Sequence, residues 1–272
     1  MLSTRILTSI VLLAAFGSAL ILLGRTQFAV LVAFFVAVGA HEWGKLSHFR
    51  PRATLAYAGS MTVLFAGLLW MSDPIQMRQT VLQAVFAGSL IMWLVLLPVW
   101  LRAGVGRRPQ WLLPVAGFAV LLPAALAMVV MQRSQLLLAL GVVWVSDTAA
   151  FFAGRAFGRH KLAPGISPGK TWEGVAGAFL ATAGYAIICA LAVPQIAARV
   201  QGVIWLAYLA GAELLLLASI LGDLFESALK RQASVKDSGS LLPGHGGVLD
   251  RIDSATAVLP IAALLMYWMA KT

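Results

Sequence analysis

Charged residues are scarce in this sequence, where they make up 11% of 272 residues, while hydrophobic residues make up 61%. An ordinary soluble domain is about a quarter charged and about half apolar, so the composition excludes a water-soluble globular protein. A bilayer core of roughly 30 Å needs about 20 apolar residues per helix. The long apolar runs therefore predict an all-α fold, a polytopic transmembrane helical bundle.

About nine apolar runs qualify as spans, and the second is short enough to be re-entrant. The runs cover residues 5–24, 27–41, 53–72, 80–101, 111–131, 135–157, 174–193, 202–229 and 254–270. Residues 1–134 alternate apolar runs with short basic loops and are interpreted as N-terminal scaffold helices. Residues 135–272 are interpreted as a C-terminal catalytic membrane region with two polar loops, and the two parts form one integral unit.

Acidic residues are rarer than basic ones, with 10 Asp and Glu against 20 Lys and Arg. In a membrane protein this excess indicates orientation, because Lys and Arg concentrate on cytoplasmic loops. With the N-terminus inside, 15 of the 20 basic residues fall on inner segments. We therefore expect an N-in, C-out protein of the inner (cytoplasmic) membrane, with its active site facing the cytoplasm. Membrane lipids are expected partners, and nucleic acid is not.

Cysteine is nearly absent: Cys189 stands alone in an apolar run, which excludes an intramolecular disulfide and a cysteine-based metal site. The segment His41-Glu-Trp-Gly-Lys resembles the zinc-protease motif HExxH. The second histidine would fall at position 45, which is Lys45, so the motif fails. We interpret Glu42 and Trp43 as a helix end anchored at the membrane interface.

Asp147 lies about halfway along an otherwise apolar run. Because an isolated carboxylate is costly to desolvate, Asp147 is expected to bind a cation, face a polar cavity or be protonated. A structural hydrogen bond between helices is the alternative. Asp147, Phe151, Gly154 and Gly158 share one helical face, and the glycines permit close approach of a helix or a headgroup.

The loop Ser167-Pro-Gly-Lys-Thr-Trp-Glu-Gly174 contains the Gly-Lys-Thr that ends a P-loop. A P-loop would need glycine where Pro164 stands, and a strand where the chain has an apolar helix. A charge at Lys170, a hydroxyl at Thr171 and the amides that start the next helix remain available to a phosphate. Ordinary helix capping beside an interfacial lysine is the alternative.

The polar stretch from Gly222 to Asp253 combines acids, bases and glycines. Asp223, Ser227 and Lys230 lie one turn apart on one helical face. Beyond them are the carboxylates Asp237, Asp250 and Asp253, oxygen donors of the kind that Mg²⁺ prefers. Basic residues and the Gly-His-Gly-Gly turn stand around them and can approach a phosphate. A solvated, salt-bridged loop is the alternative.

A family resemblance covers this stretch. The sequence Ser227-x-Leu-Lys-Arg-x4-Lys-Asp-x-Gly-x2-Leu-Pro-x-His-Gly-Gly-Val-x-Asp-Arg-Ile-Asp253 resembles the signature of the phosphatidate cytidylyltransferases (CDP-diacylglycerol synthases) at every fixed position. Ser146-Asp-Thr-Ala-Ala, Gly154-Arg, Ser167-Pro-x-Lys-Thr-x-Glu-Gly174 and Trp43 after Glu42 are similar to its upstream motifs. Gly169 departs from the pattern, because many relatives carry a second lysine there.

The resemblance implies the reaction CTP + phosphatidate → CDP-diacylglycerol + pyrophosphate, with Mg²⁺ and room for a second cation. The implied partners are CTP, phosphatidate and membrane lipids, and a homodimer is left open. The expected catalytic residues are Asp237, Asp250, Lys236, Ser227 and His245. The expected substrate-binding residues are Lys170, Thr171, Ser167, Glu173, Lys230, Arg231, Gly246, Gly247 and Arg251. The expected metal ligands are first Asp237 and Asp250, then Asp253, Asp223 and Asp147.

Three other functions compete with this one. A related enzyme would transfer the cytidylyl group to another lipid phosphate or a lipid alcohol. A cation-coupled transporter would use the buried aspartates and would tolerate loss of the phosphate-binding loop. An intramembrane aspartyl protease would need a Gly-x-Gly-Asp motif, but Ile220 stands at the first glycine position before Asp223.

Overall fold

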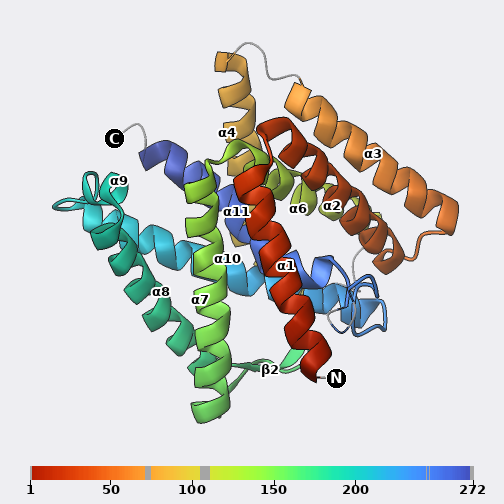
Figure 1. The fold of residues 1–272 in the computed structure, drawn as a ribbon. Coiled ribbons are helices and arrows are strands. Elements are labelled where there is room, and N and C mark those ends of the chain that lie inside the picture. The colour runs from red at the N-terminus through yellow and green to blue at the C-terminus, as the bar shows by residue number, and fades with distance from the viewer. Residues whose placement is uncertain (1, 71–74, 105–110, 243, 245, 270–272) are drawn as a thin grey trace.

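The computed structural model describes residues 2–70, 75–104, 111–242, 244 and 246–269 (Figure 1). It confirms an all-α bundle. The helices are α1 (Leu2–Leu22), α2 (Arg25–Leu46), α3 (Pro51–Trp70), α4 (Ile75–Ile91), the π-helical segment η1 (Met92–Leu96), α5 (Leu97–Ala103), α6 (Leu112–Val130), α7 (Arg133–Phe157), α8 (Trp172–Ala192), α9 (Pro194–Ala197), α10 (Ile204–Gln232) and α11 (Leu249–Met269).

Within the described residues, eight helical segments are long and apolar enough to cross a membrane. One of them joins α4, η1 and α5 over Gln79–Ala103, and α1 adds a shorter apolar stretch, Ile10–Leu22. The second span, expected to be short, is long enough to cross a membrane. Helix α2 has 22 residues, because the polar His41–Lys45 segment continues the helix instead of ending it.

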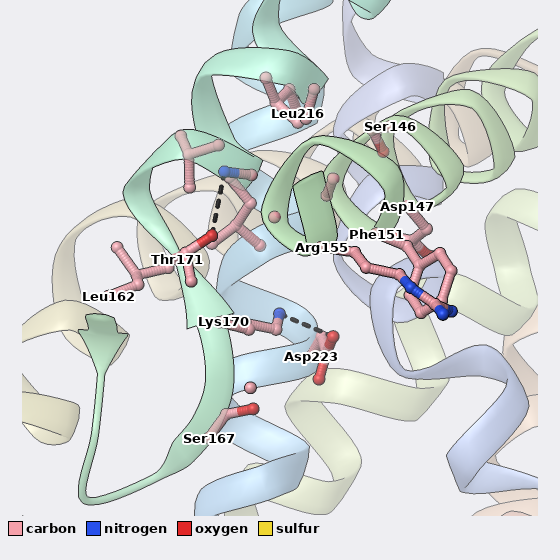
Figure 2. Close-up of a pocket in the computed structure, with 17 residues that line it drawn as sticks. Ser146, Asp147, Phe151, Arg155, Leu162, Ser167, Lys170, Thr171, Leu216 and Asp223 are labelled. Carbon is pink, nitrogen blue, oxygen red and sulfur yellow. Dashed lines mark hydrogen bonds and ion pairs between the residues drawn. The ribbon is translucent and has the colours of Figure 1, made fainter. Parts of the chain in front are cut away.

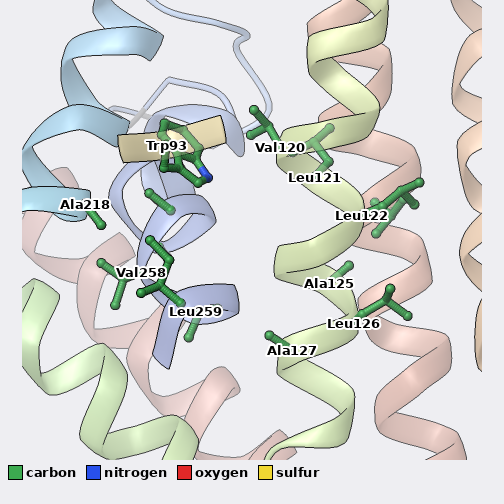
Figure 3. Close-up of a cluster of buried hydrophobic side chains, with 14 of the residues drawn as sticks. Trp93, Val120, Leu121, Leu122, Ala125, Leu126, Ala127, Ala218, Val258 and Leu259 are labelled. Atoms are coloured by element: carbon green, nitrogen blue, oxygen red, sulfur yellow. The ribbon is translucent and has the colours of Figure 1, made fainter. Parts of the chain in front are cut away.

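Helices α6 and α11 are the most buried spans. Helix α6 is apolar around its whole circumference, and so is α11 beyond its polar first turns, which is typical of helices enclosed by others. Their side chains meet near the centre of the bundle, where Val120 and Leu126 of α6 and Val258 of α11 are almost fully buried (Figure 3). Each contains an internal proline, Pro123 or Pro260, which neighbouring helices allow in a membrane span.

Helices α7 and α8 pack closely because glycines line their contact. A Cβ atom added at Gly174 would lie 2.9 Å from the carbonyl oxygen of Ala150, and one at Gly154 would lie 3.0 Å from Thr171 Oγ1. A side chain at Gly174 would push the helices apart, and one at Gly154 would crowd the start of α8. The prediction that Gly154 permits close helix approach is therefore confirmed.

The polar segment between α7 and α8 is a β-hairpin, where the sequence suggested only a loop. Strand β1 (Lys161–Ala163) pairs antiparallel with β2 (Ser167–Thr171). The hairpin is joined to the start of α8 by a hydrogen bond of 2.9 Å from Trp172 N to His160 O. It lies at one end of α7 and α8 (Figure 1) and fixes the position of Lys170.

Candidate active site

A cavity of about 560 Å³ lies between α7, β2, α8 and α10. Its polar lining residues are Ser146, Asp147, Arg155, Ser167, Lys170, Thr171 and Asp223. Figure 2 shows Lys170 joined to Asp223, with Asp147 and Arg155 on the neighbouring helix. Apolar residues, among them Phe151, form the other walls. A few charged groups in a largely apolar cavity can orient a ligand that has a charged head and a hydrocarbon part.

Lys170 forms an ion pair with a helix far along the chain. Its Nζ lies 2.6 Å from Asp223 Oδ2, and Ser227 Oγ donates to Asp223 Oδ1 at 3.3 Å. The two side chains of the ion pair remain partly accessible, at 23% for Lys170 and 32% for Asp223. The structure thus brings together three residues that were predicted in two separate motifs. The charge of Lys170 is already paired with a carboxylate.

Two further residues of the Lys170 loop have structural contacts. Thr171 Oγ1 accepts a hydrogen bond of 3.1 Å from Gly174 N and caps α8, so the capping alternative is confirmed for Thr171. Glu173 Oε1 lies 2.7 Å from Nδ1 of the exposed His160 and also accepts from His160 N. These contacts attach the hairpin to α8. Substrate binding by Thr171 and Glu173 stays a prediction.

Asp147 faces the cavity, as one of the sequence expectations required. Within the described residues it has neither a hydrogen bond nor an ion pair, so the alternative of a structural interhelical bond is not found there. Asp223 and Lys170 lie within electrostatic range of its carboxylate. Asp253 of α11 lies within range of the same three groups, and its carboxylate Oδ1 accepts from Ser254 N at 2.8 Å. We call Asp147, Lys170, Asp223 and Asp253 the cavity cluster.

Asp250, the second residue of α11, is surrounded by donors. Its Oδ2 accepts from Ser238 N and Gly247 N at 2.8 Å each and from Ser238 Oγ at 2.9 Å. Its Oδ1 lies 2.6 Å from Lys230 Nζ, which also lies 2.5 Å from Glu226 Oε2. Both oxygens of Asp250 are therefore engaged by protein donors. Its role as a metal ligand stays a prediction.

Glu42 of α2 completes this second group, a role that was not predicted for it. Its side chain is buried, with 4% exposure, and accepts hydrogen bonds from Ser238 Oγ, Val248 N and Leu249 N. Trp43 is buried as well, and its Nε1 donates to Leu113 O at 2.8 Å. The interpretation of Glu42 and Trp43 as an interfacial anchor was wrong. We call Glu42, Glu226, Lys230, Ser238 and Asp250 the loop cluster.

The other predicted residues lie around the loop cluster. Four are exposed: Arg231, Lys236, Asp237 and Arg251. Gly246 has φ +81°, and a Cβ there would lie 2.6 Å from Asp250 Oδ2 and 3.3 Å from Asp237 Cβ. Gly246 therefore permits the loop to approach Asp250. His245 lies outside the described residues.

The two clusters share helices α10 and α11. Asp253 lies within electrostatic range of Glu226 as well as of the cavity aspartates, so it connects them. Within the described part of the chain, no three His, Cys, Asp or Glu side chains converge closely enough to hold a metal by themselves. Arg155 of the cavity and Glu226 are further residues that the sequence did not single out. Two signals could have identified them: Arg155 is part of the Gly154-Arg motif, and Glu226 lies one helical turn before Lys230, with which it pairs.

Known proteins resemble the chain over nearly its full length. Residues 3–269 match the model of the cytidylyltransferase family. The phosphatidate cytidylyltransferase of Pseudomonas aeruginosa is 38% identical over 276 residues, which cover 98% of this chain and 97% of the relative. The enzyme of Haemophilus influenzae is 30% identical, over 99% of this chain and 100% of the relative. That of Brucella suis is 37% identical, over 98% of this chain and 92% of the relative. This chain belongs to the cytidylyltransferase family.

Proposed function

We propose that this enzyme is a phosphatidate cytidylyltransferase, which converts CTP and phosphatidate into CDP-diacylglycerol and pyrophosphate. The observation that carries the proposal is the match of almost the whole chain to relatives of that name. The cavity adds support, because it combines apolar walls with charged groups and so suits a phosphate attached to a lipid. No specific observation favours a transporter or a protease.

In this reaction a phosphate oxygen of phosphatidate forms a bond to the α-phosphorus of CTP. The bond from that phosphorus to the β-phosphate oxygen breaks, and pyrophosphate leaves. Because the second pKa of a phosphomonoester is about 6, the lipid phosphate is largely ionised at neutral pH and needs no strong general base. The main requirement is positive charge that allows two anions to meet. Lys170, Lys230 and the exposed basic residues of the loop would supply part of it.

We propose Mg²⁺ as the cofactor, and the donor set fits it. Asp147 faces the cavity without a described hydrogen-bond partner, and the one described donor to the Asp253 carboxylate is the neighbouring amide of Ser254. Since Mg²⁺ often uses one or two carboxylates and completes its shell with water and phosphates, the cavity cluster suffices. Asp237 and Asp250 remain predicted ligands, although a cation at Asp250 would compete with Lys230. Bound Mg²⁺ would neutralise phosphate charge. A second cation stays a prediction.

We propose an inner-membrane protein with its N-terminus and its active site on the cytoplasmic side. The distribution of basic residues supports this orientation, because most fall on the segments that would then face the cytoplasm. CTP would reach the site from the cytosol, and phosphatidate would reach it from the inner leaflet. A homodimer stays a prediction, which the mass of the detergent-solubilised protein would test.

The experiment that tests the reaction uses purified protein in detergent–lipid micelles with radiolabelled CTP, phosphatidate and Mg²⁺. We expect CDP-diacylglycerol with the wild type, no product without phosphatidate or Mg²⁺, and a severe loss with Asp250→Asn. Replacing phosphatidate by another lipid phosphate or by a lipid alcohol tests the related enzymes. If the wild type forms no CDP-lipid, or if Asp250→Asn keeps full activity, the proposal is wrong.

A further inference from the structure

Glu42 connects the N-terminal half of the chain to the loop that carries Asp250. Its Oε1 accepts from Val248 N at 3.0 Å, and its Oε2 accepts from Leu249 N at 2.9 Å. These partners are 206 and 207 residues away in sequence. Both oxygens of one buried carboxylate are thus used to hold two consecutive amides of a distant segment.

Those two amides form the start of α11. The first amides of a helix have no partner within the helix, and Val248 has no polar side chain to cap them. Glu42 provides the missing acceptor from another helix, and its negative charge is favourable at a helix N-terminus. Because Asp250 follows Leu249 directly, fixing this helix start also fixes the direction from which Asp250 and Asp253 project.

The loop before α11 packs around the Glu42 carboxylate. Ser238 Oγ lies 3.0 Å from Glu42 Oε2 and 2.9 Å from Asp250 Oδ2, and its one hydroxyl proton can serve one of them at a time. A Cβ at Gly247 would lie 2.6 Å from each Glu42 oxygen, and one at Gly239 would clash with Glu42 as well. Two glycines therefore let the loop backbone fit against Glu42.

We propose that Glu42 is a positioning residue for cytidylyl transfer, which sets the start of α11 and thereby the placement of Asp250 and Asp253. The N-terminal half then contributes to the site and does not serve only as scaffold. The inference rests on the proposed function for its activity measurement, whereas its contact with the loop is tested independently of activity.

Glu42→Gln is the sharpest variant, because it keeps the size of the side chain and one oxygen. Its NH₂ group would face a backbone N–H donor, which leaves a buried amide without an acceptor. We expect hydrogen exchange in the peptide spanning residues 246–253 to be about tenfold faster. We expect kcat to fall about 100-fold, since small misplacements of reacting groups can cost that much, with a smaller change in KM for CTP.

Trp43→Phe is the matched control. It alters the next residue of α2 and removes the hydrogen bond to Leu113 O, but no described hydrogen bond of Trp43 reaches the loop. We expect a lower Tm with unchanged exchange in peptide 246–253 and a kcat close to that of the wild type. Glu42→Asp, which keeps the charge on a shorter side chain, should give intermediate kcat and exchange.

Normal loop exchange and normal kcat in Glu42→Gln overturn the proposal. It is also overturned if Glu42→Gln and Trp43→Phe lose Tm and kcat in parallel, because Glu42 would then only stabilise the bundle. If wild type makes no CDP-lipid while Glu42→Gln still loosens the loop, the positioning contact is supported and the proposed reaction fails. Should Glu42→Gln not fold, Ser238→Ala removes only the shared hydroxyl, and unchanged exchange and kcat there would contradict the proposal.

Discussion

The cavity cluster and the loop cluster contain similar side chains but differ in how these are paired. In the cavity cluster, Asp147 has no hydrogen bond or ion pair within the described residues, and Lys170 and Asp223 form a partly accessible pair. In the loop cluster, Asp250 accepts from backbone, hydroxyl and ammonium donors. The Asp250 carboxylate is therefore held by protein donors, whereas the Asp147 carboxylate of the cavity cluster remains available to a ligand.

This difference separates two kinds of mutational effect. Buried charged groups that satisfy one another are costly to separate, because each partner is left desolvated. A carboxylate without a partner is itself a cost to the fold and is retained for its chemistry. Variants of the loop cluster should thus lose stability and activity together, whereas variants of the cavity cluster should lose activity alone.

The largest effect is expected for Lys230→Met. This change removes the ammonium group that lies 2.6 Å from Asp250 and 2.5 Å from Glu226, and it should cost about 3–5 kcal/mol of unfolding free energy. Denaturant unfolding in detergent micelles measures it. Lys170→Met is the control, because its pair with Asp223 is more exposed and should contribute no more than about 1 kcal/mol. Equal losses in the two variants would remove the distinction between the clusters.

Asp147→Asn should lower activity strongly without lowering stability. We expect kcat to fall on the order of 100-fold, as for other groups that provide electrostatic stabilisation of a transition state. Tm should stay the same or rise, because an unpaired carboxylate is removed from a membrane helix. Glu213→Gln is the control, since the Glu213 carboxylate likewise has no described partner but does not line the cavity. A drop in Tm for Asp147→Asn would show that Asp147 has a structural role.

Gly246→Ala should have a smaller effect, confined to the loop cluster. The residue has φ +81° and its Cβ would press on Asp250, so we expect a loss of about 1–2 kcal/mol in unfolding free energy. Gly165→Ala, where a Cβ would meet nothing within 4 Å, should leave stability nearly unchanged. If the two alanine variants unfold alike, the loop does not constrain Asp250 as described.

The smallest effect is expected for Glu173→Gln. Glu173 pairs with His160, whose side chain is 79% exposed, and such surface pairs contribute little and are screened by salt. We expect a Tm indistinguishable from wild type and a KM for CTP that is little changed. A large rise in KM would instead support Glu173 as a substrate-binding residue and extend the cavity cluster to the surface.

The sequence predicted the features that depend on local composition. Apolar runs marked the spans, and the cost of a buried carboxylate drew attention to Asp147, which lines the cavity. The glycine at position 154 was assigned to close packing, which its contact with α8 confirms. The hairpin was missed because β1 has only three residues. So short a strand, paired in an irregular register, leaves no alternation of polar and apolar residues in the sequence that would indicate a strand.

The pairing of side chains could not be predicted, because it depends on contacts between distant segments. Nothing near Lys170 in sequence indicates Asp223 as its partner, and nothing near Glu42 indicates Ser238 or the start of α11. The acids, bases and glycines between Ser227 and Asp253 suggested a metal and phosphate site, but their order in the sequence did not reveal that Asp250 is surrounded by donors. Glu42 is the only acidic residue among residues 1–72, and this scarcity was the one sequence feature that could have indicated a special role for it.

The contact between Glu42 and α11 has a consequence for biosynthesis. A ribosome completes α2 long before it reaches Val248, whose amide donates to Glu42 Oε1, 206 residues earlier in the chain. Since segments of a nascent chain fold in order from the N-terminus, Glu42 enters the bundle while its two amide partners do not yet exist. The loop therefore closes only after α11 has been added, and catalytic competence arrives as one of the last events of assembly.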